Sequence, residues 1–142
     1  MLGLKEEIKA RNYAGYWREA LEQQGPCCKR CQEKALSWAP SQQRWICKRC
    51  KTRTGLRCGT FMEHSPVPVW AWLHVALAVW QEGPEVDQIR LYQEIGELRL
   101  GAIRKCVARV KEAIEQRGRD FLCLRYMAHS LEGLNAQNDA AV

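Results

Sequence analysis

Hydrophobic residues recur at helical spacing near the amino terminus, with charged residues between them. The apolar stripe consists of Leu4, Ile8, Tyr16 or Trp17, Ala20 and Leu21. This periodicity is typical of an amphipathic helix. We expect the helix to cover residues 4–24 and to end at Gly25 and Pro26, which do not continue a helix.

The next segment is richer in residues that favour strands. Residues 35–38 and 44–46 have strand character, with Pro40 in the turn between them. A further hairpin is expected over residues 51–61, with Gly55 and Gly59 at turns or bulges. The tryptophans of this segment, Trp38 and Trp45, are expected to supply the core of so small a unit, and stacking on nucleic-acid bases is the alternative.

Three further helices are predicted, over residues 67–80, 85–94 and 98–116. Ser65 is a candidate cap for the first helix, and Gly96 provides the turn before the last one. The residues predicted to face inward are Trp70, Leu73, Leu77 and Trp80 in the first helix, Val86, Ile89 and Tyr92 in the second, and Leu100, Ile103, Val107, Val110 and Ile114 in the third. A short helix over residues 120–134 and a frayed tail are expected to follow.

The chain has eight cysteines, and four of them form two Cys-x-x-Cys knuckles separated by fifteen residues. The knuckles are Cys28 with Cys31 and Cys47 with Cys50. Each is a tight turn that can present two thiolates to one ion, and four thiolates make a closed tetrahedral zinc site. We therefore expect one structural Zn²⁺. Ordinary buried cysteines or disulfides are the alternative, Cys27 competes with Cys28, and Cys58 is a spare ligand. His74 lies inside an apolar helix, where a hydrogen-bonded packing role is expected.

No run of about eighteen apolar residues occurs, and the amino terminus carries charged residues where a signal peptide would be apolar. We expect a soluble cytoplasmic protein with no membrane contact. A reducing compartment favours thiolates on a metal over disulfides.

The net charge of +6 is unevenly distributed. Between residues 27 and 58 the only acidic residue is Glu33. The basic residues there are Lys29, Arg30, Lys34, Arg44, Lys48, Arg49, Lys51, Arg53 and Arg57. A small unit this positive repels itself and is stabilised by a polyanion, which makes nucleic acid the natural partner. A merely solvated basic surface is the alternative.

The helix predicted over residues 98–116 is basic on its outer faces and follows a short turn. A helix-turn-helix requires this arrangement, since its last helix must fit the major groove. The helix before it is acidic, so it cannot lie flat on phosphate, and an ordinary helical hairpin is the alternative. The residues expected to contact DNA are Lys29, Arg30, Lys48, Arg49, Arg53, Arg99, Arg104, Lys105, Arg109 and Lys111.

Several motifs in this chain occur together in one known family. They are Cys28-Lys-Arg-Cys31, Cys47-Lys-Arg-Cys50, Gly59-Thr60-Phe61, Ser65, Pro68 and Trp72, followed by Leu91, Glu94, Ile95, Gly96, Ala102 and Arg104. The pattern resembles the amino-terminal region of bacterial insertion-sequence transposases that begin with a zinc ribbon. Val69, Thr54 and Glu97-Leu98 depart from that pattern. The resemblance covers residues 25–115 and implies a ribbon followed by a DNA-binding helix-turn-helix.

The catalytic domain of that family uses three acidic residues that bind two divalent metals. After residue 115 only about 25 residues remain, too few for such a domain. Asp120, Glu132 and Asp139 are therefore expected to be surface residues. We expect no enzyme.

The expected fold class is α+β, with a small four-cysteine zinc ribbon followed by a three-helix helix-turn-helix bundle. The expected divisions are an amino-terminal helix (residues 1–25), the ribbon (residues 26–62), the helix-turn-helix bundle (residues 63–119), and a short helix with a tail (residues 120–142).

The expected function is zinc-dependent, sequence-specific binding of double-stranded DNA by a transcriptional regulator related to transposase DNA-binding regions. A transposition accessory or a repressor acting at element ends is one alternative. A zinc-ribbon protein-interaction module is another. Besides DNA, the expected partners are a second copy of the chain in a homodimer, since helix-turn-helix proteins often pair, and RNA polymerase or another regulator. The expected location is the bacterial cytoplasm, in association with the nucleoid.

Overall fold

The computed structural model describes residues 13–140 and the side chains of residues 13–130. Within that range the chain forms five helices and one three-stranded sheet, so the α+β class is confirmed. The elements are α2 (Tyr13–Gln24), β1 (Leu36–Ala39), β2 (Arg44–Cys47), β3 (Arg53–Gly55), α3 (Val69–Glu82), α4 (Gln88–Ile95), α5 (Leu100–Gln116) and α6 (Arg119–Ala140). None of these helices combines the length and the apolar character that a membrane span requires.

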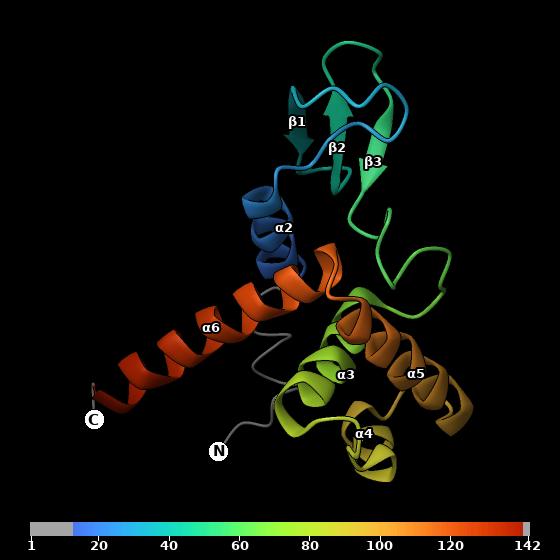
Figure 1. Ribbon diagram of the computed structural model, residues 1–142, viewed down its shortest axis with the longest axis vertical. Helices are drawn as coiled ribbons and strands as arrows, with labels where there is room; N and C mark the ends of the chain where they lie inside the picture. Colours follow the sequence, from blue (N-terminus) through green and yellow to red (C-terminus); the bar gives the residue numbers. More distant parts are fainter. Residues whose placement is uncertain (1–12, 141–142) are drawn as a thin grey trace.

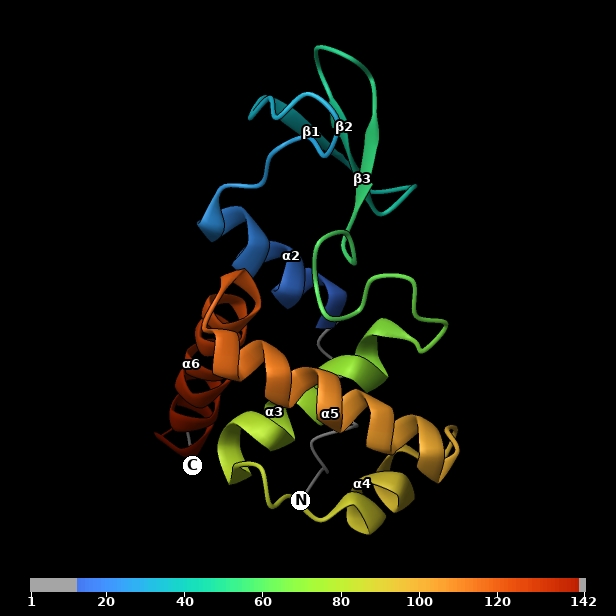
Figure 2. The same ribbon diagram turned by 45° about the vertical axis from the view of Figure 1, so that its right-hand side comes forward.

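The sheet and most of the helices lie at opposite ends of an elongated molecule (Figure 1). The three strands stand at one end, α3, α4 and α5 gather at the other, and α2 lies between them (Figures 1 and 2). Of the helix predicted over residues 4–24, the part from residue 13 onward is observed as α2. Residues 4–12 lie outside the described residues.

The strands pair in the order β1-β2-β3, and both pairings are antiparallel. Trp38 of β1 lies opposite Trp45 of β2, and their rings meet edge to face with centroids 4.9 Å apart. Trp45 is buried, so the pair supplies core to the sheet as expected. The strands predicted over residues 35–38 and 44–46 are correct to within one residue at each end.

The hairpin predicted over residues 51–61 is not formed. β3 pairs back onto β2, and a series of turns follows it. Side chains close these turns, since Thr60 Oγ1 donates to the carbonyl of Arg57 at 2.8 Å and accepts from the N–H of Met62 at 3.1 Å. Local bonds of this kind compete with a strand ladder. Gly59 does lie in a turn, with φ of +72°.

Aromatic side chains of α2 and the loop after β3 join the sheet to the helices. Trp17 is fully buried, and its Nε1–H donates to the carbonyl of Leu56 at 3.1 Å. The Trp17 ring meets Phe61 edge to face at 5.6 Å. On the sheet side, the Arg18 guanidinium lies 4.7 Å from the centre of the Trp38 ring, a favourable cation–π contact. These contacts position the sheet relative to the helices.

α3 is the central helix. Residues 71–79 are all buried, whereas the sequence predicted a single inward face. The reason is that α2, α4, α5 and α6 all contact it. His74 is buried within α3, and its Nε2 lies 2.6 Å from Glu94 Oε2 on α4. The predicted packing role of His74 is therefore confirmed.

α3 begins without the predicted serine cap. Its N-cap residue is Pro68, which makes no side-chain hydrogen bond. Ser65 Oγ instead accepts from the N–H of Val67 at 3.2 Å and from the indole N–H of Trp72 at 3.0 Å. Ser65 therefore secures the loop that leads into α3, and the helix spans residues 69–82 rather than 67–80.

α4 turns a different face to the core from the predicted one. Val86 is buried as expected, but Ile89 and Tyr92 are 52% and 43% exposed. Leu91 and Ile95 are fully buried instead. Leu91 and Ile95 lie about one helical turn apart and share a face. Positions two residues apart on a helix differ by about 200° in direction, so Ile89 and Leu91 point to opposite sides and cannot both face the core.

α5 follows the turn at Gly96, where a φ of +72° confirms the predicted role of this glycine. The buried residues of α5 are Ile103, Cys106, Val107, Val110 and Ala113. Leu100 and Ile114, which were expected to face inward, are only partly buried.

α6 is longer than the predicted short helix over residues 120–134. It continues to Ala140 through most of the segment expected to be a frayed tail. No proline interrupts residues 131–140, so nothing there breaks the helical hydrogen bonds. The side chains of Glu132 and Asp139, expected at the surface, lie outside the described side chains.

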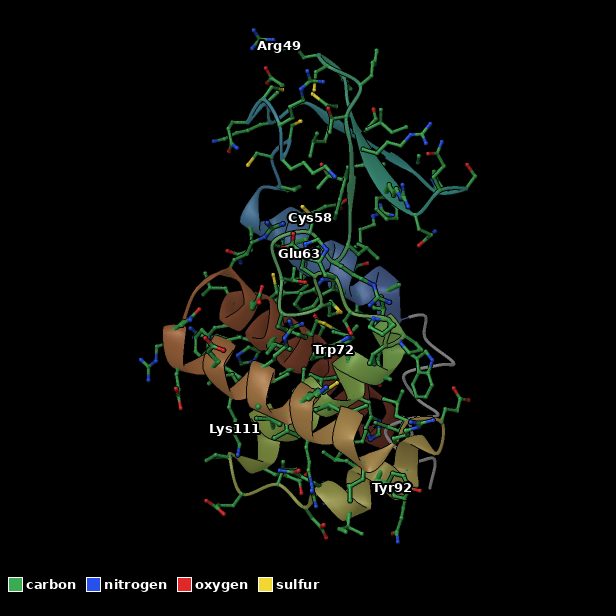
Figure 3. All side chains as sticks on the ribbon, turned by 90° about the vertical axis from the view of Figure 1, so that its right-hand side faces the viewer. Arg49, Cys58, Glu63, Trp72, Tyr92 and Lys111 are labelled. Atoms are coloured by element: carbon green, nitrogen blue, oxygen red, sulfur yellow. The ribbon has the colours of Figure 1, made fainter. Side chains whose placement is uncertain are left out.

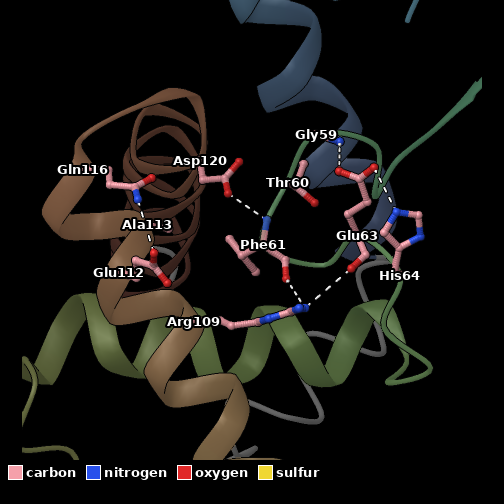
Figure 4. Close-up of a pocket in the computed structure, with 10 residues that line it drawn as sticks. All are labelled: Gly59, Thr60, Phe61, Glu63, His64, Arg109, Glu112, Ala113, Gln116 and Asp120. Atoms are coloured by element: carbon pink, nitrogen blue, oxygen red, sulfur yellow. Dashed lines mark hydrogen bonds and ion pairs between the residues drawn. The ribbon is translucent and has the colours of Figure 1, made fainter.

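A loop, residues 59–64, is held by side chains of α5 and α6 (Figure 4). Asp120 Oδ2 accepts from the N–H of Phe61 at 2.8 Å. Arg109 Nη1–H donates to the carbonyls of Phe61 at 3.3 Å and Glu63 at 3.5 Å. Asp120 is therefore not the surface residue that the sequence predicted, because it ties α6 to this loop and is partly buried.

Replacing Trp17 with alanine should destabilise the fold strongly. The change removes a fully buried ring and leaves the buried Leu56 carbonyl without its donor. We expect the free energy of unfolding to fall by about 3–5 kcal/mol, as measured by denaturant unfolding. Tyr92→Ala is the control, since Tyr92 is 43% exposed and lies outside the buried core, and it should change stability by less than about 0.5 kcal/mol. Equal losses in the two variants would contradict the role given to Trp17.

The Asp120→Asn variant should gain stability relative to wild type as pH rises. Burial raises the pKa of Asp120 above its usual range, and the N–H of Phe61 and the charge of Arg119 only partly offset this. The stability linked to a raised carboxyl pKa is full below the unfolded pKa of about 3.9 and is lost as pH rises through the folded pKa. Asparagine does not titrate. Urea unfolding of both proteins should therefore show the free energy of unfolding of the variant rising relative to that of wild type from pH 4 to pH 7. A stability difference that does not change with pH would contradict the raised pKa of Asp120.

Candidate metal centre

The segments that carry four of the cysteines lie at the end of the sheet away from the helices (Figure 1), and their side chains meet there. These cysteines belong to the two knuckles, Cys28 with Cys31 and Cys47 with Cys50, and their sulfurs all lie within 4.8 Å of one another. The closest pairs are Cys28 Sγ with Cys50 Sγ and Cys31 Sγ with Cys47 Sγ, both at 3.6 Å. The structure therefore brings together the four cysteines that the sequence predicted.

The two knuckles have the same backbone design. In each, the residue after the second cysteine donates its N–H to the carbonyl of the first cysteine: Gln32 to Cys28 and Lys51 to Cys47, both at 3.0 Å. Gln32 and Lys51 also share a left-handed conformation, with φ of +64° and +65°. Residues other than glycine adopt it rarely. Its repetition indicates two turns shaped alike, each aiming its sulfurs at one point.

The spacing of the sulfurs fits a tetrahedral ion. A Zn–S distance of about 2.3 Å separates tetrahedral sulfur ligands by about 3.8 Å, close to the 3.6 Å of the nearest pairs. Four thiolates leave no open position for water or substrate. The cluster can therefore hold a metal ion in a structural role.

Hydrogen bonds favour the thiolate form of two of the four cysteines, Cys28 and Cys50. The hydroxyl of Thr52, 3.1 Å from Cys50 Sγ, and then the Thr52 N–H lower the pKa of Cys50 to about 6. The N–H of Cys31 is the main cause of the lowered pKa of Cys28. For Cys31 the N–H of Glu33 acts in the same direction, but burial and the neighbouring thiols raise its pKa to about 12. Since thiolates are the metal ligands, protons and metal compete for the cluster.

The other four cysteines lie outside the cluster. Cys27 Sγ lies 3.5 Å from Gln32 Oε1, and Cys58 is partly exposed in the loop after β3. Cys106 and Cys123 are buried between helices, where burial raises the pKa values to about 11 and about 12. No disulfide occurs among the described residues.

The ribbon residues predicted to contact DNA are all exposed. Lys29 and Arg30 lie in the first knuckle, Lys48 and Arg49 in the second, and Arg53 on β3. Arg49 marks the far end of the molecule (Figure 3). Among the described residues, none of the five has a carboxylate within 4.0 Å. Their charge is therefore available to an anion.

The five basic residues predicted on the last helix do not share one surface. Arg99, Arg104 and Lys105 are exposed around the first half of α5. Arg109 is engaged with backbone carbonyls of the loop at residues 59–64. Lys111 is partly buried and lines a separate hollow of about 290 Å³ beside α3. Arg99 and Lys105 line one hollow together with Arg109, Arg104 is exposed on the same half of α5, and Lys111 lies apart from these four.

Two basic residues outside the predicted set join the ribbon surface. Arg44 lies on the same sheet face as Arg53, because Arg53 pairs with Ile46 and side chains two apart on a strand share a face. Arg57 Nη1–H donates to the carbonyl of Ser65 at 2.8 Å. Strand alternation could have indicated Arg44. The position of Arg57 depends on turns that its local sequence does not specify.

Comparison of the chain with protein-family models, with curated proteins and with solved structures finds no match. We therefore infer function from the residues of this chain. Its two candidate features are the cysteine cluster and the basic surfaces.

Each chain should bind one ion through the four clustered thiols. Titration of the full-length protein with Co²⁺ should give the absorption of a tetrahedral thiolate site, which Zn²⁺ should abolish. Cys47→Ser should bind at least about tenfold more weakly, since it removes a ligand. Cys58→Ser is the matched control and should keep the full metal content. Metal loss from Cys58→Ser, with none from Cys47→Ser, would reverse the assignment.

Proposed function

We propose that this chain is a zinc-dependent, sequence-specific double-stranded DNA-binding protein, a transcriptional regulator related to the DNA-binding regions of insertion-sequence transposases. The observation that carries the proposal is the exposed, basic first half of α5, which follows a short turn from α4. Zn²⁺ is the proposed ion, since four thiolates at tetrahedral spacing favour it. Its role is to hold the ribbon in its fold.

The proportions of α4, the turn and α5 support a helix-turn-helix. α4 has eight residues and ends at Gly96, and α5 begins at Leu100. Leu91 and Ile95 of α4 and Ile103 of α5 are fully buried, and both helices contact α3. In DNA-binding proteins with this motif, the second helix enters the major groove.

The outer face of α5 supplies groups suited to base contact. At about 100° per residue, Gly101, Arg104, Lys105 and Ala108 fall opposite the buried face, and all four are exposed. The two small residues allow a ligand to approach the backbone closely, and the long basic side chains can reach base edges and phosphates. Since early residues of a recognition helix usually reach the bases, Arg104 and Lys105 are the proposed reading residues.

The charge of α4 keeps that helix away from phosphates. Arg90 donates to the carboxylate of Glu82 and lies 3.2 Å from Glu94, so its charge is neutralised within the chain. Its hydrogen bond also holds the pKa of Glu82 below the usual range. Glu85 and Asp87 are exposed nearby. A duplex is therefore attracted to the ribbon and the first half of α5 and repelled at α4.

One observation favours the alternative of a protein-interaction module. Ile89 and Tyr92 are exposed three residues apart on α4, and exposed apolar groups mark protein contacts when they form a patch. The ribbon tryptophans do not support this alternative, because Trp38 lies against Arg18 and Trp45 is buried in the sheet. An absence of duplex binding at low salt would favour the interaction module.

Variants of the two basic surfaces should fail in different ways. Arg104→Ala should narrow the affinity gap between a selected duplex and a scrambled one by about 1–3 kcal/mol, because base contacts carry the sequence information. The double variant Lys48→Ala, Arg49→Ala should weaken binding to both duplexes and reduce the salt slope by about one for each lost phosphate contact. Fluorescence anisotropy of the zinc-loaded protein across a salt series measures both effects.

Arg125→Ala is the matched control for this comparison. It removes one exposed positive charge from α6, outside both basic surfaces. The affinity gap between the two duplexes and the salt slope of binding should both stay unchanged. If Arg104→Ala retains full discrimination while the Lys48→Ala, Arg49→Ala protein loses it, the ribbon reads the sequence and the role given to α5 is wrong.

A further inference from the structure

Three hollows meet at one exposed histidine. One, between residues 59–64, α5 and α6, carries Glu63, Glu112 and Asp120 (Figure 4), and the charged residues of the other two are mainly basic. The first basic hollow, of about 530 Å³, lies between the ribbon sheet and residues 55–64. The second, of about 1000 Å³, lies between residues 64–67 and the first half of α5. His64 lines all three hollows, and its side chain is 89% exposed. Together the two basic hollows lead from the ribbon to the outer face of α5.

Basic side chains line the hollows on both sides of His64. The ribbon hollow carries Lys29, Arg44, Arg53 and Arg57, against Glu63 alone. The α5 hollow carries Arg99, Lys105 and Arg109, against Glu97 alone. Positive charge lining a concave surface raises the local concentration of an anionic ligand.

Two of these arginines are fixed in place without losing their charge. Arg57 Nη1–H donates to the carbonyl of Ser65, and Arg109 Nη1–H donates to the carbonyl of Phe61. Carbonyl oxygens are neutral, so each guanidinium keeps its full charge and has further N–H groups to offer. Arg90, by contrast, is neutralised by two carboxylates.

The acidic residue of the ribbon hollow is engaged by the loop itself (Figure 4). Glu63 Oε2 accepts from the N–H of Gly59 at 3.0 Å, and Glu63 Oε1 lies 3.4 Å from His64 Nε2. Its carboxylate is thereby directed toward donors of the loop. The positive charges of Arg44, Arg53 and Arg57 have no carboxylate within 4.0 Å among the described residues.

We propose that residues 57–66 support one strand of duplex DNA, whose phosphate backbone follows both basic hollows across His64. This inference rests on the proposed DNA-binding function and adds the path of the backbone, with Arg44, Arg57 and His64 as further contacts. A single small anion would use only one of the two groups of charges, whereas a row of phosphates matches both. Phosphate contacts fix the register of a protein on a duplex, so the loop positions α5 over the bases.

The test uses full-length, zinc-loaded protein with a selected duplex and a scrambled duplex. His64→Asp places a negative charge where the hollows meet, and aspartate tolerates the left-handed φ of +62° found there. We expect binding to both duplexes to weaken about fivefold at low salt, with a smaller effect at high salt. Arg44→Gln with Arg53→Gln should reduce the salt slope by about one to two. The affinity ratio between the duplexes should not change in either variant.

His129→Asp makes the same charge change on α6, outside both hollows, and should leave duplex binding unchanged. Melting temperature and zinc content should match wild type in every variant.

If wild type binds duplex DNA but His64→Asp and the arginine double variant bind equally well, the backbone path is wrong while the proposed function stands. If wild type does not bind duplex DNA, both proposals fail. Tighter binding of polyglutamate than of duplex, lost in the same variants, would assign the hollows to an acidic protein and overturn the inference.

Discussion

The convergence of four thiols on one point is the constraint on which the ribbon depends. Strands of three and four residues bury too little surface to be stable by themselves, and the Trp38–Trp45 pair is a small core. The knuckles hold their sulfurs at distances that suit one shared ion. Binding of an ion in the folded state alone contributes directly to folding free energy. The positions of the exposed basic residues in and beside the knuckles therefore depend on the cysteine cluster.

The loop after β3 connects the ribbon to the helices and is fixed by contacts with them. Phe61 is central to it, because its ring contacts both Trp17 and Trp72 and its backbone binds Asp120 and Arg109. One short segment is thus attached to α2, α3, α5 and α6. This explains how a loop without regular secondary structure can present fixed charges between the ribbon and α5.

Features with local determinants could be predicted from the sequence, and features set by distant contacts could not. The knuckles follow from cysteine spacing, and the turn at Gly96 follows from glycine alone. Two apolar faces of α4 competed, and packing against α3 and α5 selected Leu91 over Ile89. Asp120 binds a backbone N–H that lies 59 residues earlier, and Arg109 was selected for its charge although its guanidinium is bound to carbonyls. No local pattern indicates either contact.

The joint between α2 and the sheet has a consequence for affinity under the proposed function. The ribbon and α5 are separate basic surfaces, and Trp17 and Arg18 hold them in one relative orientation. Two weak surfaces held in this way act as a bivalent ligand, since engagement of one presents the other at a high effective concentration. Loosening Arg18 from Trp38 would lower that effective concentration, and with it the avidity for DNA, without removing a single group that faces the duplex.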